Sequence, residues 1–339
     1  MDMQPQETMF DANSRVTWRE SGIDIPEGMV EVDKVLEHAG LDWEARMQPQ
    51  IVRRSDGSYE EVPNSFYCMR SDLDGAGAVL GDGFRKIYEP IQNRDMFSFC
   101  DALVAMADAR YVSVGLLNNG RRVWALAELP DAQVDLKGSV LDPTNLYLLV
   151  YNSFDGGAQF TAAITGVRMR CHNVANYALK QAQRMWRIRH TPNAPNRMGA
   201  AAHALDLVGE YQDEFGEQMQ HLLNASLEEA EFERLLGNLW PVNKDGELSS
   251  RSENQRGMVR DAYTDATTCN LEGMAGTRYA ALNAVSLYAD YGRGTRDTSA
   301  NDGTTAEENR LRSIFWGGSQ QLKQRAFDLL LEDEIPSAA

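Results

Sequence analysis

The sequence predicts an α+β protein in which an antiparallel β-meander is flanked by helices and followed by a mostly helical C-terminal part. The tripeptide Asn-Asn-Gly at 118–120 separates two alternating β-rich runs, and Asn-Gly is a strong signal for a hairpin turn. Two further strands are predicted at 146–152 and 158–170, joined by a Gly-Gly turn. From Met198 onward, apolar residues recur at the spacing typical of helices.

Shorter elements are predicted before this meander. The segment 30–38 has helical spacing, and Gly40 follows it where a helix-capping glycine belongs. An amphipathic helix is expected at 96–107, because its apolar residues lie on one side. Alternating β-rich segments predict strands at 41–52, 66–70 and 78–81.

Helices are predicted to dominate after the meander. One is expected from His172 to about Met185, and others at 198–236, 253–266, 275–290 and 305–332. The segment Trp-Arg-Ile-Arg-His, which starts at Trp186, is read as extended. These elements predict three parts: a flexible N-terminal arm at 1–15, an α+β domain with a β-meander core at 16–192, and a helical region at 193–339.

Composition excludes several classes of protein. The 339 residues include 43% hydrophobic residues, which is ample for a globular core, and their formal net charge is −17. No apolar run approaches the roughly 18–20 residues that span a bilayer, and the first residues lack the features of a signal peptide. We therefore expect a cytoplasmic protein of a bacterial host cell, with no membrane partner. The four cysteines form no Cys-x-x-Cys pair, so we expect each of them to be a small buried hydrophobic side chain.

The sequence holds no strong catalytic motif. It has no phosphate-binding P-loop, no Gly-x-Ser-x-Gly and no His-Glu-x-x-His, and the glycines around Gly77 do not fit the dinucleotide-binding pattern. We therefore expect no cofactor and a non-enzymatic protein. A metal-dependent enzyme that uses Asp72, Asp74 or Asp82 stays open as a third interpretation, although their flanking glycines favour turns.

A basic segment stands out in this acidic chain. No acidic residue occurs between Asp155 and Asp206, and basic residues recur through that interval. A strand, a helix and a second strand here would present basic, amide and aromatic side chains on one surface, as a groove for single-stranded nucleic acid requires. The candidate nucleic-acid-binding residues are Arg168, Arg170, Asn173, Tyr177, Lys180, Arg184, Arg187 and Arg189, with Arg121 and Arg122 on the hairpin.

The next segment supports a competing interpretation. Residues 206–233 carry nine acidic residues and no Lys or Arg. They could neutralise the basic surface within one subunit or across an interface between subunits. Both interpretations remain open at this point, and the second makes a homo-oligomer plausible.

Several segments together resemble a known family. In order they are TWRESGIDIPEG, VLEHAGLDWEA, GDGFRKIYEPIQN, NNGRRVWALAELP, YLLVYNSFDGG, ITGVRMRCHNVANYAL, WRIRHT, ALNAVSLYADYGRG and GGSQQLKQRAFDLL. From about Trp18 to Leu331 the chain resembles the phage/plasmid-like protein family, also described as a bacterial domain of unknown function 932. The resemblance implies a bacteriophage, prophage or plasmid origin. It implies no activity and no catalytic residues.

The order helix, β-meander, helix over 96–185 is also similar to the core of ring-forming single-strand annealing proteins. That similarity is one of topology alone, and the net charge of −17 departs from their usual basic character. The leading hypothesis is a phage- or plasmid-encoded, non-enzymatic protein that binds single-stranded DNA and assists annealing or recombination. The alternative is an acidic protein that engages a phage or host protein, either as a mimic of DNA or as a modulator of the host.

Overall fold

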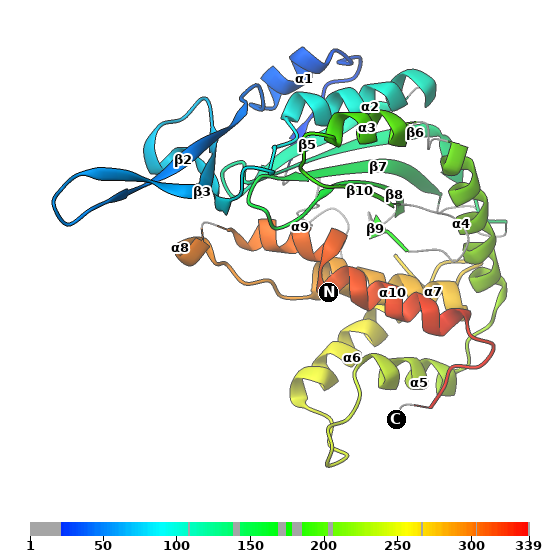
Figure 1. The fold of residues 1–339 in the computed structure, drawn as a ribbon. Helices are drawn as coiled ribbons and strands as arrows, with labels where there is room; N and C mark the ends of the chain where they lie inside the picture. The colour runs from blue at the N-terminus through cyan, green and yellow to red at the C-terminus, as the bar shows by residue number, and fades with distance from the viewer. Residues whose placement is uncertain are drawn as a thin grey trace, which may run out of the picture.

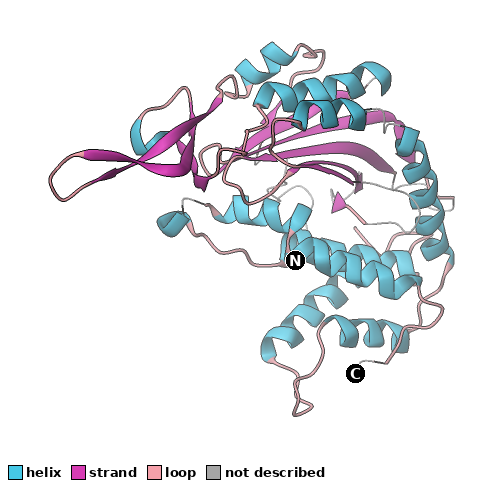
Figure 2. Cartoon of the chain, viewed as in Figure 1, coloured by secondary structure: helices cyan, strands magenta, loops and turns pink. Residues whose placement is uncertain are grey.

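A computed structural model describes residues 22–107, 109–137, 143–168, 174–177, 185–202, 206–265, 267–302 and 304–337. It confirms the predicted α+β class: antiparallel sheets occupy the first part of the chain, and helices dominate the rest (Figures 1 and 2). Within the described residues, no helix is both long enough and apolar enough to cross a lipid bilayer.

The main sheet contains the predicted meander. Its strands follow the order β1-β5-β6-β7-β8-β10, and a short β9 pairs with β8 off this path. All these pairings are antiparallel. The strands are β1 (Ile23–Asp24), β5 (Arg110–Leu117), β6 (Arg122–Val134), β7 (Thr144–Ser153), β8 (Phe160–Arg168), β9 (Val174–Ala175) and β10 (Met185–Ile188).

The predicted hairpin joins β5 to β6. Asn118, Asn119 and Gly120 have φ angles of 50°, 55° and 89°, a region that asparagine and glycine adopt more readily than other residues. At Gly120 a Cβ atom would also lie 3.0 Å from the ring of Trp43. The turn is therefore encoded locally by its three residues.

Helices cover both faces of the main sheet (Figure 1). The helices α1 (Val32–His38), α2 (Asn93–Ala107) and α3 (Ala194–Ala202) cover one face. The alternation of β6 fits this arrangement, because Val123 and Ala125 pack in the cluster that holds Met96 of α2. Trp124 and Leu126 point the other way and pack with residues of α9, Leu311 among them.

A second, smaller sheet projects from the body of the molecule (Figure 1). It consists of β2 (Ala45–Arg53), β3 (Tyr59–Arg70) and β4 (Val79–Phe84), and a 3-10 turn at Gly75–Ala78 precedes β4. The strands predicted at 41–52, 66–70 and 78–81 are thus confirmed, with β3 longer than expected.

The helical C-terminal part packs beneath the other face of the main sheet (Figure 2). The segment predicted as helical at 198–236 is divided between α3, α4 and α5, and the segment at 305–332 is interrupted at Gly317. A Cβ atom at Gly317 would lie 2.9 Å from the Cα of Ser313, so the chain turns sharply there. The elements are α4 (Asp206–Asn224), α5 (Glu229–Leu239), α6 (Ser250–Thr264), α7 (Arg278–Leu287) with a π-helical turn Tyr288–Gly292, α8 (Ser299–Asp302), α9 (Ala306–Trp316) and α10 (Gly318–Leu331).

The helix predicted from His172 to Met185 does not form at the residues of this segment that the structure describes, 174–177 and 185. Val174–Ala175 form β9, and Met185 begins β10. The side chain of Asn176 is buried and donates to the carbonyl oxygens of Ile314 and Phe315 at the end of α9. Contacts with distant helices therefore override the local helical pattern in this segment.

Candidate functional site

Four strands of the main sheet form the floor of an open groove. Their register places Tyr151 of β7 opposite Thr161 of β8, and Thr161 opposite Arg187 of β10. Residues opposite each other on neighbouring strands point to the same face, so these three side chains lie in one row. Arg122 shares that face, because it is two residues before Trp124, which pairs with Tyr151.

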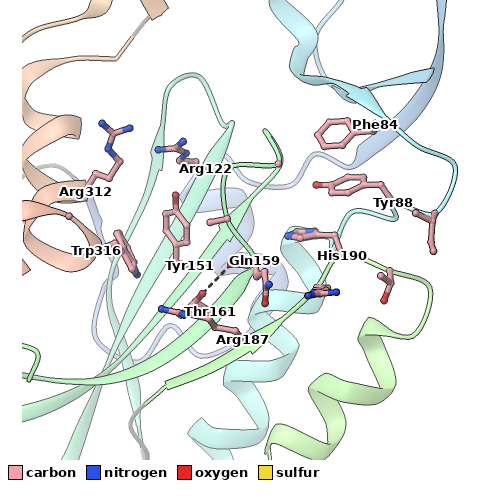
Figure 3. A pocket seen from close by; sticks show the side chains of 17 residues that line it. Phe84, Tyr88, Arg122, Tyr151, Gln159, Thr161, Arg187, His190, Arg312 and Trp316 are labelled. Carbon is pink, nitrogen blue, oxygen red and sulfur yellow. Dashed lines mark hydrogen bonds between the residues drawn. The ribbon is translucent and has the colours of Figure 1, made fainter. Parts of the chain in front are cut away.

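Three loops and the end of α9 form the walls of the groove (Figure 3). Its volume is about 1040 Å³, and we refer to it as the arginine groove. The wall residues are Phe84 at the end of β4 with Ile87 and Tyr88 after it, Gly156, Gly157, Ala158 and Gln159 between β7 and β8, Arg189, His190 and Thr191 after β10, and Arg312 and Trp316 of α9 with Gly317.

Positive charge collects in the arginine groove. Its described lining includes Arg122, Arg187, Arg189 and Arg312, and no aspartate or glutamate. The Nε atom of Arg122 donates to Asp155 at 2.9 Å, which fixes this guanidinium at the edge of the floor. The other three arginines are exposed and form no ion pair with a carboxylate of the described residues. They are free to bind an external anion.

Aromatic rings line both sides of the arginines. On one wall Phe84 stacks on Tyr88 with ring centroids 4.1 Å apart, and Tyr88 stacks on His190 at 5.2 Å. On the opposite side, Trp316 packs against Tyr151 at 4.1 Å (Figure 3). Guanidinium groups can bind phosphates, and partly exposed rings can stack on bases.

Burial keeps the titratable rings of the groove uncharged at neutral pH. Burial lowers the pKa of His190 to about 4 and raises the pKa of Tyr151 to about 12. The Nδ1 atom of His190 accepts from the backbone N–H of Ile91 at 3.2 Å, so the proton of the neutral ring lies on Nε2. That Nε2 atom has no hydrogen-bond partner among the described residues. The arginines therefore carry the charge of the groove.

The structure brings together three of the residues predicted from sequence. Arg122, Arg187 and Arg189 line the arginine groove, and Arg121 lines a smaller adjoining pocket that shares Arg122 and Arg312. The backbone of Arg168 pairs with Thr144, at the opposite end of β8 from Thr161, and its side chain is outside the described part of the structure.

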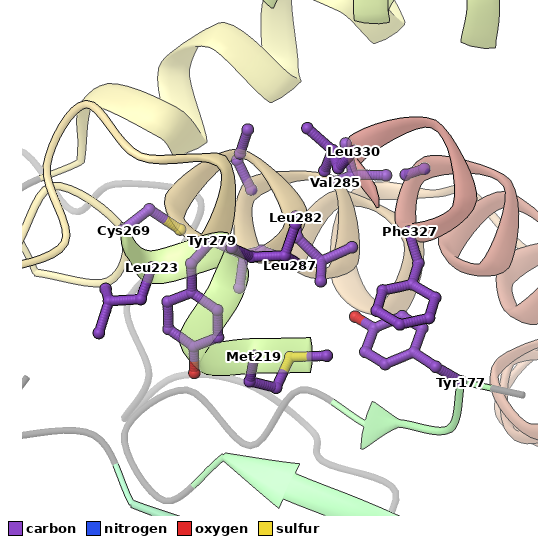
Figure 4. Packing of buried hydrophobic residues seen from close by; sticks show 14 of the residues in the cluster. Tyr177, Met219, Leu223, Cys269, Tyr279, Leu282, Val285, Leu287, Phe327 and Leu330 are labelled. Atoms are coloured by element: carbon purple, nitrogen blue, oxygen red, sulfur yellow. The ribbon is translucent and has the colours of Figure 1, made fainter. Parts of the chain in front are cut away.

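Tyr177 was predicted to contact nucleic acid, and the structure contradicts that prediction. Its side chain is 2% exposed, its hydroxyl forms a hydrogen bond with Ser286 at 2.8 Å, and its ring stacks on Phe327 (Figure 4). A ring buried in the core between α7 and α10 is not available to stack on a base. The predicted residues Arg170, Asn173, Lys180 and Arg184 lie outside the described residues.

The acidic segment 206–233 forms ion pairs within the helical part. Glu233 pairs with Arg260 at 2.7 Å, and Glu231 pairs with Arg278 at 3.3 Å. The hydrogen bonds from Arg260 lower the pKa of Glu233. Arg187, Arg189 and Arg197, whose side chains the structure describes in the basic segment, are not partners of these carboxylates.

The aspartates considered for metal binding do not gather at one point. Asp72 forms an ion pair with Arg70 at 2.7 Å. The hydrogen bonds that Arg70 donates lower the pKa of the Asp72 carboxyl. Asp74 and Asp82 are exposed. Across the part of the chain that the structure describes, no group of three or more His, Cys, Asp and Glu side chains could hold a metal ion.

Sequence reasoning missed the residues that complete the groove. Arg312 and Trp316 come from α9, far from the basic segment in sequence, whereas Phe84 ends β4 and Tyr88 lies in the loop after it. One signal was available: Arg312 and Trp316 are four residues apart and share one side of a predicted helix.

Comparisons with known proteins give a family but no activity. No curated protein matches the chain, and no solved structure matches it. A family model described as a domain of unknown function, DUF932, matches residues 83–315. That range includes the meander, the basic segment between Asp155 and Asp206 and most of the arginine groove. The chain belongs to the DUF932 family.

Proposed function

We propose that this protein binds single-stranded DNA in the arginine groove and assists annealing or recombination without catalysing a reaction. The phage or plasmid origin implied by the family resemblance is part of the same proposal. The observation that carries it is the set of Arg187, Arg189 and Arg312, which face one groove without carboxylate partners among the described residues.

The charge distribution supports an anionic ligand. In a chain with a net charge of −17, exposed arginines gathered in one groove form a local positive surface that attracts anions. Elsewhere in the fold, Arg260 and Arg278 pair with glutamates. In the arginine groove, Arg122 pairs with Asp155, but Arg187, Arg189 and Arg312 form no ion pair with a described carboxylate, so a phosphate backbone could bind these three without displacing one.

The aromatic walls favour a single strand over a duplex. The faces of bases are hidden inside a duplex, whereas a single strand exposes them for stacking. Phe84, Tyr88 and Trp316 are partly exposed at the groove.

The test is a fluorescence-anisotropy titration with a single-stranded oligonucleotide of about 40 nucleotides at low and moderate salt. We expect affinity to fall with salt with a log–log slope of several units, because several phosphates release their counterions. The double variant Arg187→Glu, Arg189→Glu should lose binding while its thermal melt stays close to that of the wild type, since both side chains are exposed.

The matched control is Arg53→Glu with Arg296→Glu. Both arginines are exposed, neither lines the groove, and the change in net charge is the same. Equal loss of binding in the two double variants would show an effect of net charge alone and contradict the groove. If the wild type binds no DNA even at low salt, the acidic protein-interaction hypothesis replaces this proposal. Light scattering on the same samples tests the proposed homo-oligomer.

A further inference from the structure

A second pocket, separate from the arginine groove, lies in the helical C-terminal part. It has a volume of about 420 Å³ and is formed by α6, the π-helical turn, the start of α10 and Trp240 after α5. Arg251, Arg293 and Arg325 line it together with Gln255, Gln321 and Tyr288. Its described lining contains no aspartate or glutamate.

Among the described residues, few partners bind the donors of the three arginines. Arg325 donates to the backbone carbonyl of Asn238, whereas Arg251 and Arg293 form no ion pair with a described carboxylate. Burial raises the pKa of Tyr288, and the positive charges of Arg293 and Arg251 act against that rise. Both guanidinium groups therefore lie near the Tyr288 side chain at the pocket.

Gly318 allows Arg293 to occupy its position. A Cβ atom at Gly318 would lie 2.7 Å from Nη1 and 2.9 Å from Nη2 of Arg293. The guanidinium thus packs against the backbone of the first turn of α10, whose N–H groups carry partial positive charge. A cation in that position is unfavourable by itself, and a bound anion would offset the repulsion.

We propose that this pocket binds the phosphate group of a phosphorylated ligand, held by Arg251, Arg293 and Arg325. A phosphate monoester carries close to two negative charges and three acceptor oxygens, which match several guanidinium groups better than a carboxylate does. A free nucleotide and the phosphorylated end of a DNA strand share this chemistry. The proposal does not rest on DNA binding in the arginine groove.

The test is isothermal titration calorimetry of the full chain with inorganic pyrophosphate. We expect a site in the wild type whose affinity is about tenfold or more lower in Arg293→Gln, since charge-assisted hydrogen bonds are lost. Gly318→Ala should weaken binding similarly without removing a charge, because its Cβ displaces the Arg293 guanidinium. Arg53→Gln is the control and should bind as the wild type does, whereas Arg187→Gln measures any binding that belongs to the arginine groove.

The outcomes separate this site from the groove. No binding by the wild type, or unchanged affinity in both Arg293→Gln and Gly318→Ala, overturns the proposal, and so does a loss confined to Arg187→Gln. The source of the phosphate follows from two further titrations. Tighter binding of a 5′-phosphorylated strand than of its unphosphorylated form, abolished by Arg293→Gln, would identify a strand end. Binding of adenosine monophosphate without that difference would identify a free nucleotide.

Discussion

The chain uses its cationic side chains in two contrasting ways. In the helical core, Lys323 and Asp290 are 0% and 1% exposed and lie 2.8 Å apart. Asp290 accepts from the backbone N–H of Val174, and Lys323 donates to the carbonyl oxygen of the same residue. The pair therefore holds β9 against α10 and the π-helical turn. In the arginine groove, by contrast, Arg187, Arg189 and Arg312 are exposed and form no ion pair with a described carboxylate.

The contrast separates structural charges from charges available to a ligand. A buried ion must have internal partners, because an unpaired charge in the core is very costly. An exposed arginine needs none, and several of them in one concave surface bind anions. Removing a core cation should therefore change stability, whereas removing a groove cation should change binding.

The largest expected effect is that of Lys323→Met. This variant leaves Asp290 buried without its cation and should lower the free energy of unfolding by about 3–5 kcal/mol. Urea denaturation followed by circular dichroism measures the change. Adding Asp290→Asn should recover part of the loss, because the amide oxygen can still accept from Val174. A single variant as stable as the wild type would contradict the structural role of this pair.

A smaller effect on stability should come from His190 and depend on pH. Its pKa is about 4 in the fold and 6.5 in a free side chain, so the unfolded chain binds a proton first as the pH falls. The stability contributed by the neutral ring is complete above pH 6.5 and is lost toward pH 4, by up to about 3 kcal/mol.

The measurement is urea denaturation at several pH values for the wild type and His190→Gln. Carboxylates with lowered pKa values, such as Glu233, also affect stability in acid, so the difference between the two proteins is the quantity to follow. The difference should shrink as the pH falls from 6.5 toward 4. A constant difference would show that His190 does not stay neutral in the fold.

Local sequence signals predicted most of the sheet. The hairpin at 118–120 was predictable because asparagine and glycine tolerate the positive φ angles that the turn needs. The segment around Tyr177 was not, because its structure depends on contacts with Ser286 and Phe327, more than a hundred residues away. Helical periodicity cannot report such long-range contacts.

The candidate site was predictable only in part, because local signals identify some of its residues and long-range packing adds the others. Arg187 and Arg189 were found because they lie in one segment without acidic residues. Arg312 is in the groove only because α9 packs against the sheet face that holds Tyr151. No local signal shows that two segments so distant in sequence form one surface.

The smallest expected effect compares two arginines on one helix. Arg310 and Arg312 both belong to α9, but Arg310 donates to the backbone carbonyls of Asp290 and Tyr291 at 3.1 Å and 3.0 Å, whereas Arg312 faces the groove. Arg312→Gln should reduce the salt dependence of DNA binding by about 0.7 in log–log slope, the value for one phosphate contact on a single strand. Its melting temperature should stay close to that of the wild type.

Arg310→Gln should show the reverse result. It loses charge-assisted hydrogen bonds to two carbonyls, so its unfolding free energy should fall by about 1–3 kcal/mol while the salt slope stays unchanged. Anisotropy titrations and thermal melts on both variants measure the two quantities side by side. If both variants changed the melt and neither changed the slope, Arg312 would be a structural residue like Arg310. The distinction between paired and available charges would then fail for two residues of the same helix. Arg310 and Arg312 are two positions apart in α9, so their side chains leave the helix on different sides.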